Sequence, residues 1–497
     1  AAPDGWSNRS WPETVLYELH IGTFTSAGTF NGVTAELPRL KEIGITAVEL
    51  MPVADFPGRW NWGYDGVLPF AADRRYGTRD DLHQLVESTH RHNLALWLDV
   101  VYNHFGPEGN YLHLYAPQFF SDSIDTPWGP GIDFTRPEVR QFFIENAVYW
   151  TRELGIDGLR LDAVHAIEDP SERNGGVHIL EELAATVRRA APDGKAVHLV
   201  LENDKNQARF LSPADPDDPT EAPEENYSSR YSGQWNDDIH HAFHILLTGE
   251  TFGYYGDYAD QPEHHLIRAL AEGYVYQGEV SPGTGTPRGE TSTHLSPTRF
   301  IAFLQNHDQI GNRAWGERLR SLAPPEALDA AITALLLSPQ TPLIFMGEEV
   351  GTEAPFQFFC DFDAELADAV RTGRRREFGL EDIPDPIAKA TVDASVPDRY
   401  AENRWTALYR TLLTIRRREL VPLLPRMQAG TYTEIPDTAP VVSWNAADTR
   451  WCLAVNLSDT PRALPVSPSG VAVYPTAPLP VGRIPEWTTV VWKETSV

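Results

Sequence analysis

The sequence predicts an α/β fold, a (β/α)₈ TIM barrel followed by a small C-terminal antiparallel β domain. Eight short apolar runs recur up to residue 349, with amphipathic stretches between them, and this pattern is typical of parallel strands covered by helices. Eight repeats favour a closed barrel over an open sheet. Beyond about Pro425 short apolar runs alternate with Pro, Gly, Asn and Asp, which indicates an antiparallel sheet.

The predicted barrel strands leave room for a helix after each one. Eight runs fit this pattern, at residues 15–22, 46–53, 94–104, 157–164, 198–203, 234–241, 299–308 and 341–349. Between the first two, Leu37, Leu40 and Ile43 recur at helical spacing and predict one apolar helix face. Functional residues of such a barrel lie at the C-terminal ends of its strands, so the search for chemistry starts there.

A domain boundary is expected where the alternation of predicted barrel strands and helices stops. We assign residues 1–424 to a catalytic barrel, with an excursion at 105–137 after the third strand, and residues 425–497 to a C-terminal β-sandwich domain. Segment 204–232, after the fifth strand, is rich in Pro, Asp, Glu and Ser and is expected to be an exposed loop.

Composition and charge exclude several classes of protein. A formal net charge of −29 repels phosphate backbones and anionic lipid, so we expect neither nucleic acid nor a membrane surface as a partner. No apolar run reaches the roughly 18 residues that span a bilayer. The two cysteines, Cys360 and Cys452, exclude a disulfide framework and fit a reducing, cytoplasmic compartment. Aromatic residues, 11% of the chain, are enough to fill a core and also to line a ligand groove.

Three predicted strands end in acidic residues, Asp162, Glu202 and Asp308. Breaking a glycosidic bond with retention requires one ionised carboxylate to attack the sugar carbon and one protonated carboxyl to release the leaving oxygen. Arg160 precedes Asp162 by two residues, so both side chains should point into the barrel, where the guanidinium favours an ionised carboxylate. Glu202 follows the apolar run LVL and is expected to keep its proton through partial desolvation.

Four segments in this order resemble the signature regions of the α-amylase clan of glycoside hydrolases. They are DVVYNH (99–104), DGLRLDAVH (157–165), the glutamate of LVLEN and QNHDQ (305–309). The resemblance implies that Asp162 is the nucleophile, Glu202 the acid/base and Asp308 an acid that binds sugar hydroxyls. It also implies sugar contacts by the matching residues His104, Arg160, His307 and, as an aromatic platform, Tyr64 of NWGYDG.

Within this clan the chain is most similar to the maltooligosyltrehalose trehalohydrolases. The resemblance rests on YELHIGTFTSAGTF, NWGYDG, NHFGPEGNYL, WNDDIHHAFH, QNHDQIGNRAWGERL and FMGEE. It implies hydrolysis of the α-1,4 bond next to a terminal trehalose, with release of trehalose and a maltooligosaccharide, and a maltooligosyltrehalose synthase as pathway partner. Relatives usually carry an N-terminal β domain before this region, whereas only a short segment precedes Tyr17 here.

Further substrate contacts are predicted for Asp65, Trp235, Asp237, Gln309 and Phe356. Ordinary packing is an equally good interpretation for Trp235 and Phe356. The acids and histidines of segment 237–241 are expected on the sixth strand, where neighbours point to opposite faces. We therefore favour polar contacts to the substrate or the barrel mouth, keep structural roles as the alternative and place a metal site last. A calcium site needs 6 to 8 oxygen ligands, and no loop of the sequence offers them, so we predict no metal or other cofactor.

Two alternative activities stay open, those of a glycogen branching enzyme and a plain α-amylase. The segment NHDQIGNR after the seventh strand argues against a branching enzyme. A glucan-binding protein that has lost its activity would be expected to lack one of the acids, and all three are present.

Overall fold

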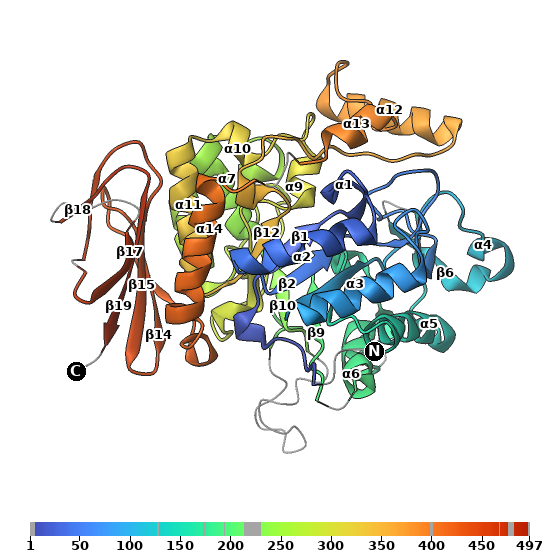
Figure 1. Ribbon diagram of the computed structural model, residues 1–497, viewed down its shortest axis with the longest axis horizontal. Coiled ribbons are helices and arrows are strands. Elements are labelled where there is room, and N and C mark those ends of the chain that lie inside the picture. Colours follow the sequence, from blue (N-terminus) through green and yellow to red (C-terminus); the bar gives the residue numbers. More distant parts are fainter. Residues whose placement is uncertain are drawn as a thin grey trace.

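The computed structural model describes residues 5–126, 129–171, 175–192, 194–212, 230–397, 401–466, 468–475 and 482–495 (Figure 1). A closed barrel forms the centre of the molecule, and the C-terminal sheet stands at one side of it (Figure 1). Residues 213–229, within the predicted loop after the fifth strand, lie outside the described part of the chain.

Eight parallel strands close the predicted barrel, in the order β1-β12-β11-β10-β9-β8-β5-β2. They are β1 (Leu16–Leu19), β2 (Ala47–Leu50), β5 (Ala95–Val100), β8 (Gly158–Leu161), β9 (His198–Leu201), β10 (Gly233–Trp235), β11 (Phe300–Ala302) and β12 (Thr341–Phe345). Each lies inside its predicted run, except that β10 begins one residue earlier. The predicted TIM barrel is therefore confirmed.

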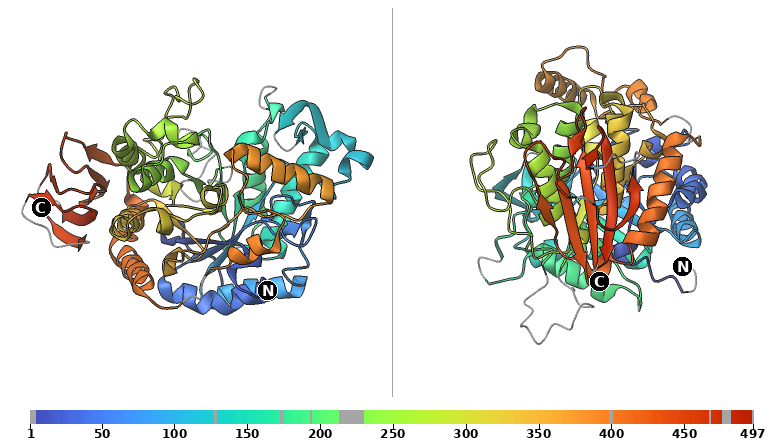
Figure 2. Two further views of the ribbon diagram at one scale, coloured as in Figure 1. Left: turned by 90° about the horizontal axis from the view of Figure 1, so that it is seen from above. Right: turned by 90° about the vertical axis from the view of Figure 1, so that its left-hand side faces the viewer.

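Helices surround the barrel and also cover its C-terminal end (Figure 2). They are α1 (Ile21–Phe24), α2 (Phe30–Ile43), α3 (Arg79–Arg91), α4 (Leu112–Tyr115), α5 (Pro137–Val148), α6 (Ile179–Ala190), α7 (Asp237–Thr248), α8 (Pro262–Glu272), α9 (His307–Gly311), α10 (Leu319–Leu322), α11 (Pro325–Leu337), α12 (Ala364–Phe378), α13 (Lys389–Ala394) and α14 (Arg404–Ile415). Leu37, Leu40 and Ile43 of α2 are buried, as their spacing predicts. In the described residues no helix is long and apolar enough to cross a membrane.

All eight predicted strands extend past the observed ones at their C-terminal ends, and the sixth and seventh include the start of a helix that carries site residues. The sixth was predicted to reach residue 241, but β10 ends at Trp235 and α7 begins at Asp237. Asn236 caps this helix, because its side chain accepts a hydrogen bond from the Ile239 N–H and so satisfies a free helix donor. The seventh was predicted to reach residue 308, but β11 ends at Ala302 and α9 begins at His307. Asp237 and Asp308 therefore lie in the first turns of helices.

The excursion after β5 contains α4 and the antiparallel pair β6 (Phe120–Thr126) and β7 (Gly129–Ile132). A second antiparallel pair, β3 (Ala54–Asp55) and β4 (Leu68–Ala72), follows β2. Both insertions come after barrel strands, so they add walls at the end of the barrel where the strands' carboxyl ends open.

The C-terminal region forms a five-stranded antiparallel sheet in the order β13-β14-β15-β19-β17, and β16 pairs with β18. Its strands are β13 (Thr431–Thr433), β14 (Val441–Ala446), β15 (Thr449–Asn456), β16 (Arg462–Ala463), β17 (Val471–Pro475), β18 (Arg483–Ile484) and β19 (Thr488–Thr495). Trp444 donates to the Leu270 carbonyl of α8 and Trp451 to the Leu337 carbonyl of α11. The sheet is thus joined to the barrel helices. The predicted boundary at 424/425 stays a prediction.

Candidate active site

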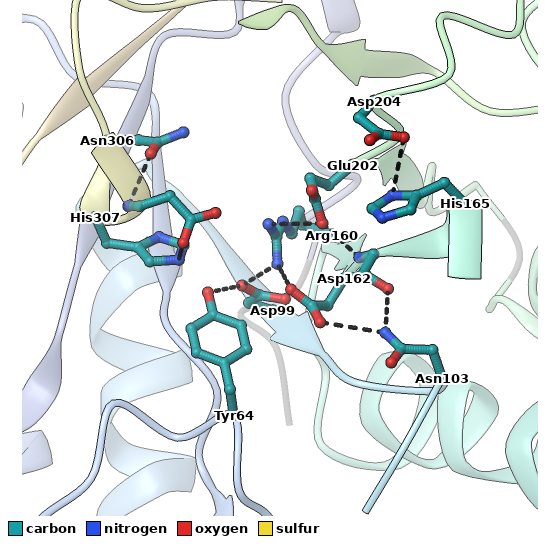
Figure 3. Close-up of polar contacts among 12 residues, drawn as sticks. Tyr64, Asp99, Asn103, Arg160, Asp162, His165, Glu202, Asp204, Asn306 and His307 are labelled. Atoms are coloured by element: carbon teal, nitrogen blue, oxygen red, sulfur yellow. Dashed lines mark hydrogen bonds and ion pairs between the residues drawn. The ribbon is translucent and has the colours of Figure 1, made fainter. Parts of the chain in front are cut away.

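The ends of neighbouring strands bring the predicted acids together. Asp162 follows β8 directly and Glu202 follows β9 directly, and these two strands pair in parallel. Arg160 lies between their carboxylates in the close-up view (Figure 3). The strand register explains this convergence, since parallel neighbours carry their carboxyl ends to the same edge.

Arg160 is the centre of the site. Its Nη1 lies 2.7 Å from Asp162 Oδ1 and 2.7 Å from Asp99 Oδ2, and its Nη2 lies 3.4 Å from Glu202 Oε2. The side chain is completely buried and its guanidinium stacks 4.2 Å from the centre of the Trp235 ring. One buried cation therefore faces three carboxyl groups, which makes their ionisation states depend on one another.

Asp162 is held on both oxygens. Oδ1 accepts from Arg160, and Oδ2 accepts from Asn103 Nδ2 at 3.3 Å. The next residue, Ala163, has φ +41°, a left-handed backbone conformation that residues other than glycine rarely adopt and that is often found at functional sites. This conformation directs the Ala163 N–H to Glu202 Oε2. The backbone after Asp162 thus fixes the position of the second acid.

Glu202 is in a different electrostatic environment. Burial raises its pKa well above the usual range; Arg160 opposes this shift, while the carboxylates of Asp162, Asp308 and Asp237 add to it. Glu202 therefore keeps its proton near neutral pH. Asp162 lies beside it and contacts the same guanidinium. Two neighbouring carboxyl groups in unlike environments are the arrangement that separates an acid from a nucleophile.

His307 and Tyr64 form a rigid wall on the opposite side (Figure 3). Their rings stack with centres 5.0 Å apart, and the Tyr64 hydroxyl donates to Asp99 Oδ2 at 2.6 Å. Burial alone lowers the pKa of His307, but the carboxylates of Glu18 and Asp308 outweigh it and raise the pKa to about 9. Protonated His307 forms a buried ion pair with Glu18, so the site contains a second cation besides Arg160.

A cleft of about 750 Å³ opens beside these residues, and Asp308, Asp237 and Gln309 line it. Gln309 Nε2 donates to Asp237 Oδ1 at 3.2 Å. Burial and the Asp308 carboxylate raise the pKa of Asp237 to about 7. Asp204 and Lys205, which follow Glu202 along the chain, line the same cleft, so it extends away from the acids on the side of Glu202.

Known proteins resemble this chain over most of its length. A model of the alpha amylase catalytic domain matches residues 4–117. The malto-oligosyltrehalose trehalohydrolase of Saccharolobus solfataricus is 42% identical over 82% of this chain and 69% of its own length. The chain belongs to the malto-oligosyltrehalose trehalohydrolase family. The family resemblance predicted from the sequence motifs is confirmed.

Two further comparisons extend the trehalohydrolase match. The malto-oligosyltrehalose trehalohydrolase of Deinococcus radiodurans is 39% identical over 86% of this chain and 70% of its own length. A Salmonella typhimurium crystal structure that carries an alpha amylase name is 44% identical with a TM-score of 0.92, and covers 99% of this chain and 83% of the other. The chain thus spans about 70% of the length of both trehalohydrolases.

The predicted substrate contacts fall into three groups. Tyr64, Arg160, His307, Asp237 and Gln309 surround the acids or line the cleft, as described above. His104 is buried, with Nε2 2.9 Å from the Tyr64 carbonyl oxygen, and Asp65 Oδ2 accepts from Asn61 at 2.6 Å. These contacts brace the Tyr64 segment. Direct sugar contacts by His104 and Asp65 stay predictions.

Trp235 and Phe356 lie in the interior. Trp235 is 2% exposed and packs beneath Arg160. Phe356 is fully buried and stacks on Trp62, with ring centres 5.3 Å apart. The packing interpretation that the sequence left open describes both positions, and neither ring is available to a sugar in this arrangement.

Several residues of the site were missed or left open by the sequence. Glu18, the partner of His307, lies on β1, and its only signal was a charged residue within an apolar run. Asp99 begins the segment DVVYNH, but no role of its own was predicted for it from the sequence; it accepts from both Arg160 and Tyr64. Burial raises the pKa of Asp99 to about 7, an effect that Arg160 opposes and Asp162 strengthens. Its position one pleat before the end of β5 could have revealed it.

Metal binding finds little support in the acids and histidines of segment 237–241. Asp238 accepts from Asn206, Tyr258 and the Val275 N–H, and His240 contacts the Leu304 carbonyl. Among the residues that the structure describes, no group of three or more His, Cys, Asp or Glu side chains is arranged to hold a metal ion. The prediction that the enzyme needs no metal stays a prediction.

Proposed function

We propose that this protein hydrolyses the α-1,4-glucosidic bond next to the terminal trehalose of maltooligosyltrehalose, with Asp162 as nucleophile and Glu202 as acid/base. The observation that carries the proposal is the unlike environment of two adjacent acids in a chain of the trehalohydrolase family: Arg160 and Asn103 hold Asp162, while burial keeps the proton on Glu202.

In the first step an Asp162 oxygen attacks the anomeric carbon on the non-reducing side of the scissile bond. The bond from that carbon to the trehalose oxygen breaks, and its electron pair takes the Glu202 proton. Trehalose leaves, and a maltooligosyl ester forms on Asp162. Arg160 Nη1 donates to Asp162 Oδ1 at 2.7 Å and so holds this carboxyl group in place for the attack.

In the second step Glu202, now ionised, takes a proton from water. The resulting oxygen nucleophile attacks the anomeric carbon, and the ester bond to Asp162 breaks. Two inversions at one carbon give net retention. Asp308, which lines the cleft, would bind sugar hydroxyls more tightly as the ring flattens, which favours the transition state over bound substrate.

The cleft suits the leaving group of this reaction. Its volume of about 750 Å³ is within the range of small-molecule sites, and it opens on the side of the acid that protonates the leaving oxygen. A glycosyl-transferring enzyme that forms the trehalose terminus, such as a maltooligosyltrehalose synthase, would supply the substrate.

The test is product analysis by chromatography after incubation with maltotriosyltrehalose and, separately, with maltopentaose. We expect trehalose and maltotriose from the first substrate and little cleavage of the second. Rapid cleavage of maltopentaose, or products longer than the starting material, would replace the proposal by an amylase or branching activity. The matched control is Asp162→Asn, which removes the nucleophile with almost no change in volume and should show no turnover of either substrate.

A further inference from the structure

His241 is a buried histidine that faces the cleft. It lies one helical turn after Asp237 on α7, so the two side chains share a helix face, and both line the cleft. His241 is 7% exposed. The rings of Tyr254 and Tyr258 flank it, each with its centre 4.8 Å from the imidazole centre. The imidazole is thus held in one orientation at the cleft wall.

The hydrogen bonding of His241 differs from that of the other two histidines of α7. His240 Nδ1 lies 2.6 Å from the Leu304 carbonyl oxygen, and its Nε2 lies 3.1 Å from the Tyr255 hydroxyl. His244 Nε2 lies 2.7 Å from Glu250. By contrast, His241 Nδ1 is buried without a hydrogen-bond partner among the described residues. Buried polar groups in native proteins are almost always paired. Because His241 also lines the cleft, its unpaired nitrogen points to a partner that binds in this cleft.

The chemistry of the cleft identifies that partner. Burial, together with His240, Arg288 and His244, lowers the pKa of His241 well below its usual value, so the ring is neutral and offers one donor and one acceptor. The cleft is lined by hydroxyl residues, such as Thr284 and Thr286, and by both acidic and basic residues. A neutral imidazole at the wall of such a mixed polar cleft fits a ligand that both donates and accepts, as a sugar hydroxyl does.

The position of the cleft indicates which part of the substrate would supply this hydroxyl. Asp204 and Lys205, two and three residues after the proposed acid/base, line it together with Asp308. We propose that His241 is a specificity-determining residue whose imidazole hydrogen-bonds a hydroxyl of the leaving trehalose unit. This inference rests on the proposed function and deepens it, because it names a residue that selects the trehalose end of the substrate.

The test compares three variants with the wild type. His241→Phe keeps a ring between the tyrosines and removes both nitrogens; His241→Gln keeps a donor and an acceptor. His244→Gln, on the same helix, is the matched control, because its amide can still reach Glu250. The readouts are the inhibition constant of trehalose and kcat/KM on maltotriosyltrehalose and on maltopentaose, with urea unfolding as the check on folding.

For His241→Phe we expect a roughly 3- to 10-fold weaker inhibition by trehalose and an equal loss of kcat/KM on maltotriosyltrehalose, the effect of one hydrogen bond. Cleavage of maltopentaose should change less than 2-fold, His241→Gln should recover most of the loss, and His244→Gln should bind trehalose as the wild type does. Unchanged trehalose inhibition in His241→Phe, or an equal loss on both substrates, overturns the inference.

Different results would contradict the proposed function and the proposed role of His241. A wild-type protein that cleaves both substrates equally well contradicts the proposed function. A wild-type protein that prefers maltotriosyltrehalose, together with an unaltered preference in His241→Phe, contradicts the role of His241 alone.

Discussion

At the scale of single residues, several buried carboxyl groups of the active site lie close to two buried cations, Arg160 and protonated His307. Glu49 on β2 pairs in register with Glu18 on β1 and is completely buried. Neither of its carboxyl oxygens has a hydrogen-bond partner within the described residues. Burial raises the pKa of Glu49 well above its usual range; Glu18 and Asp99 add to the shift, and Arg160 and His307 oppose it. Glu49 is therefore a neutral carboxylic acid beneath the catalytic pair.

This state predicts how the stability of a Glu49→Gln variant depends on pH. Above the unfolded-state pKa of glutamate, about 4.3, the unfolded wild type loses a proton that the folded protein keeps. The free energy of unfolding of the wild type then falls as pH rises, by up to about 1.4 kcal/mol for each pH unit until the folded pKa is reached. Glutamine does not titrate, so the variant should gain stability relative to the wild type between pH 5 and pH 8.

Urea unfolding of both proteins at these two pH values measures the difference. Because every other titrating group is shared, its contribution cancels. A stability difference that does not change with pH would mean that Glu49 is ionised in the folded protein.

From the sequence the positions of the acids at the strand ends could be predicted, but the choice between packing and sugar contact for the aromatic residues could not, for a physical reason. Asp162 and Glu202 directly follow strands whose apolar pattern is plain, so their direction could be inferred. Whether a ring reaches the cleft depends on packing by distant segments. Phe356 is covered by Trp62 and Phe345, residues that only the closed barrel brings to it.

At the scale of elements, short capped helices set the positions of the polar groups around the cleft. Asn306 caps α9: its side chain accepts from the Asp308 N–H at 2.9 Å, and its own N–H donates to Gln309 Oε1 at 3.1 Å. At the start of α9, Asn is followed three residues later by Gln, and at the start of α7, Asn is followed by two acids. Both patterns are typical of helix starts. The predicted strands overran because no Gly or Pro marks the strand end in segments 234–241 and 299–308.

Asn306→Ala should therefore reduce both stability and activity. Loss of the cap costs about 1 kcal/mol of unfolding free energy, and the displaced first turn of α9 moves His307 and Asp308, which we expect to lower kcat/KM about 10-fold or more. The matched control is Asn403→Ala, which removes the cap of α14, where Asn403 Oδ1 accepts from the Trp405 N–H at 2.8 Å. It should lose similar stability in urea and keep wild-type kcat/KM; equal activity in the two variants would contradict this role of α9.

At the scale of the whole molecule, segments remote in sequence complete the barrel. Trp11 stacks on Trp97 of β5, with ring centres 6.0 Å apart, and Trp6 donates to Asp157 Oδ1 at 2.9 Å. The strand count and the C-terminal antiparallel sheet could be predicted from apolar periodicity. These long-range contacts could not, because a single tryptophan carries no information about its partner.

The central claim is that these distant elements bring Asp162 into position as a nucleophile that becomes covalently bound to the sugar. The most direct measurement uses the Glu202→Gln variant and α-maltotriosyl fluoride, whose fluoride leaves without needing the acid, while the base for the second step is missing. Mass spectrometry of the quenched, digested protein should find one maltotriosyl group on Asp162. A sugar attached to another residue, or turnover with inversion and no adduct, would contradict the account.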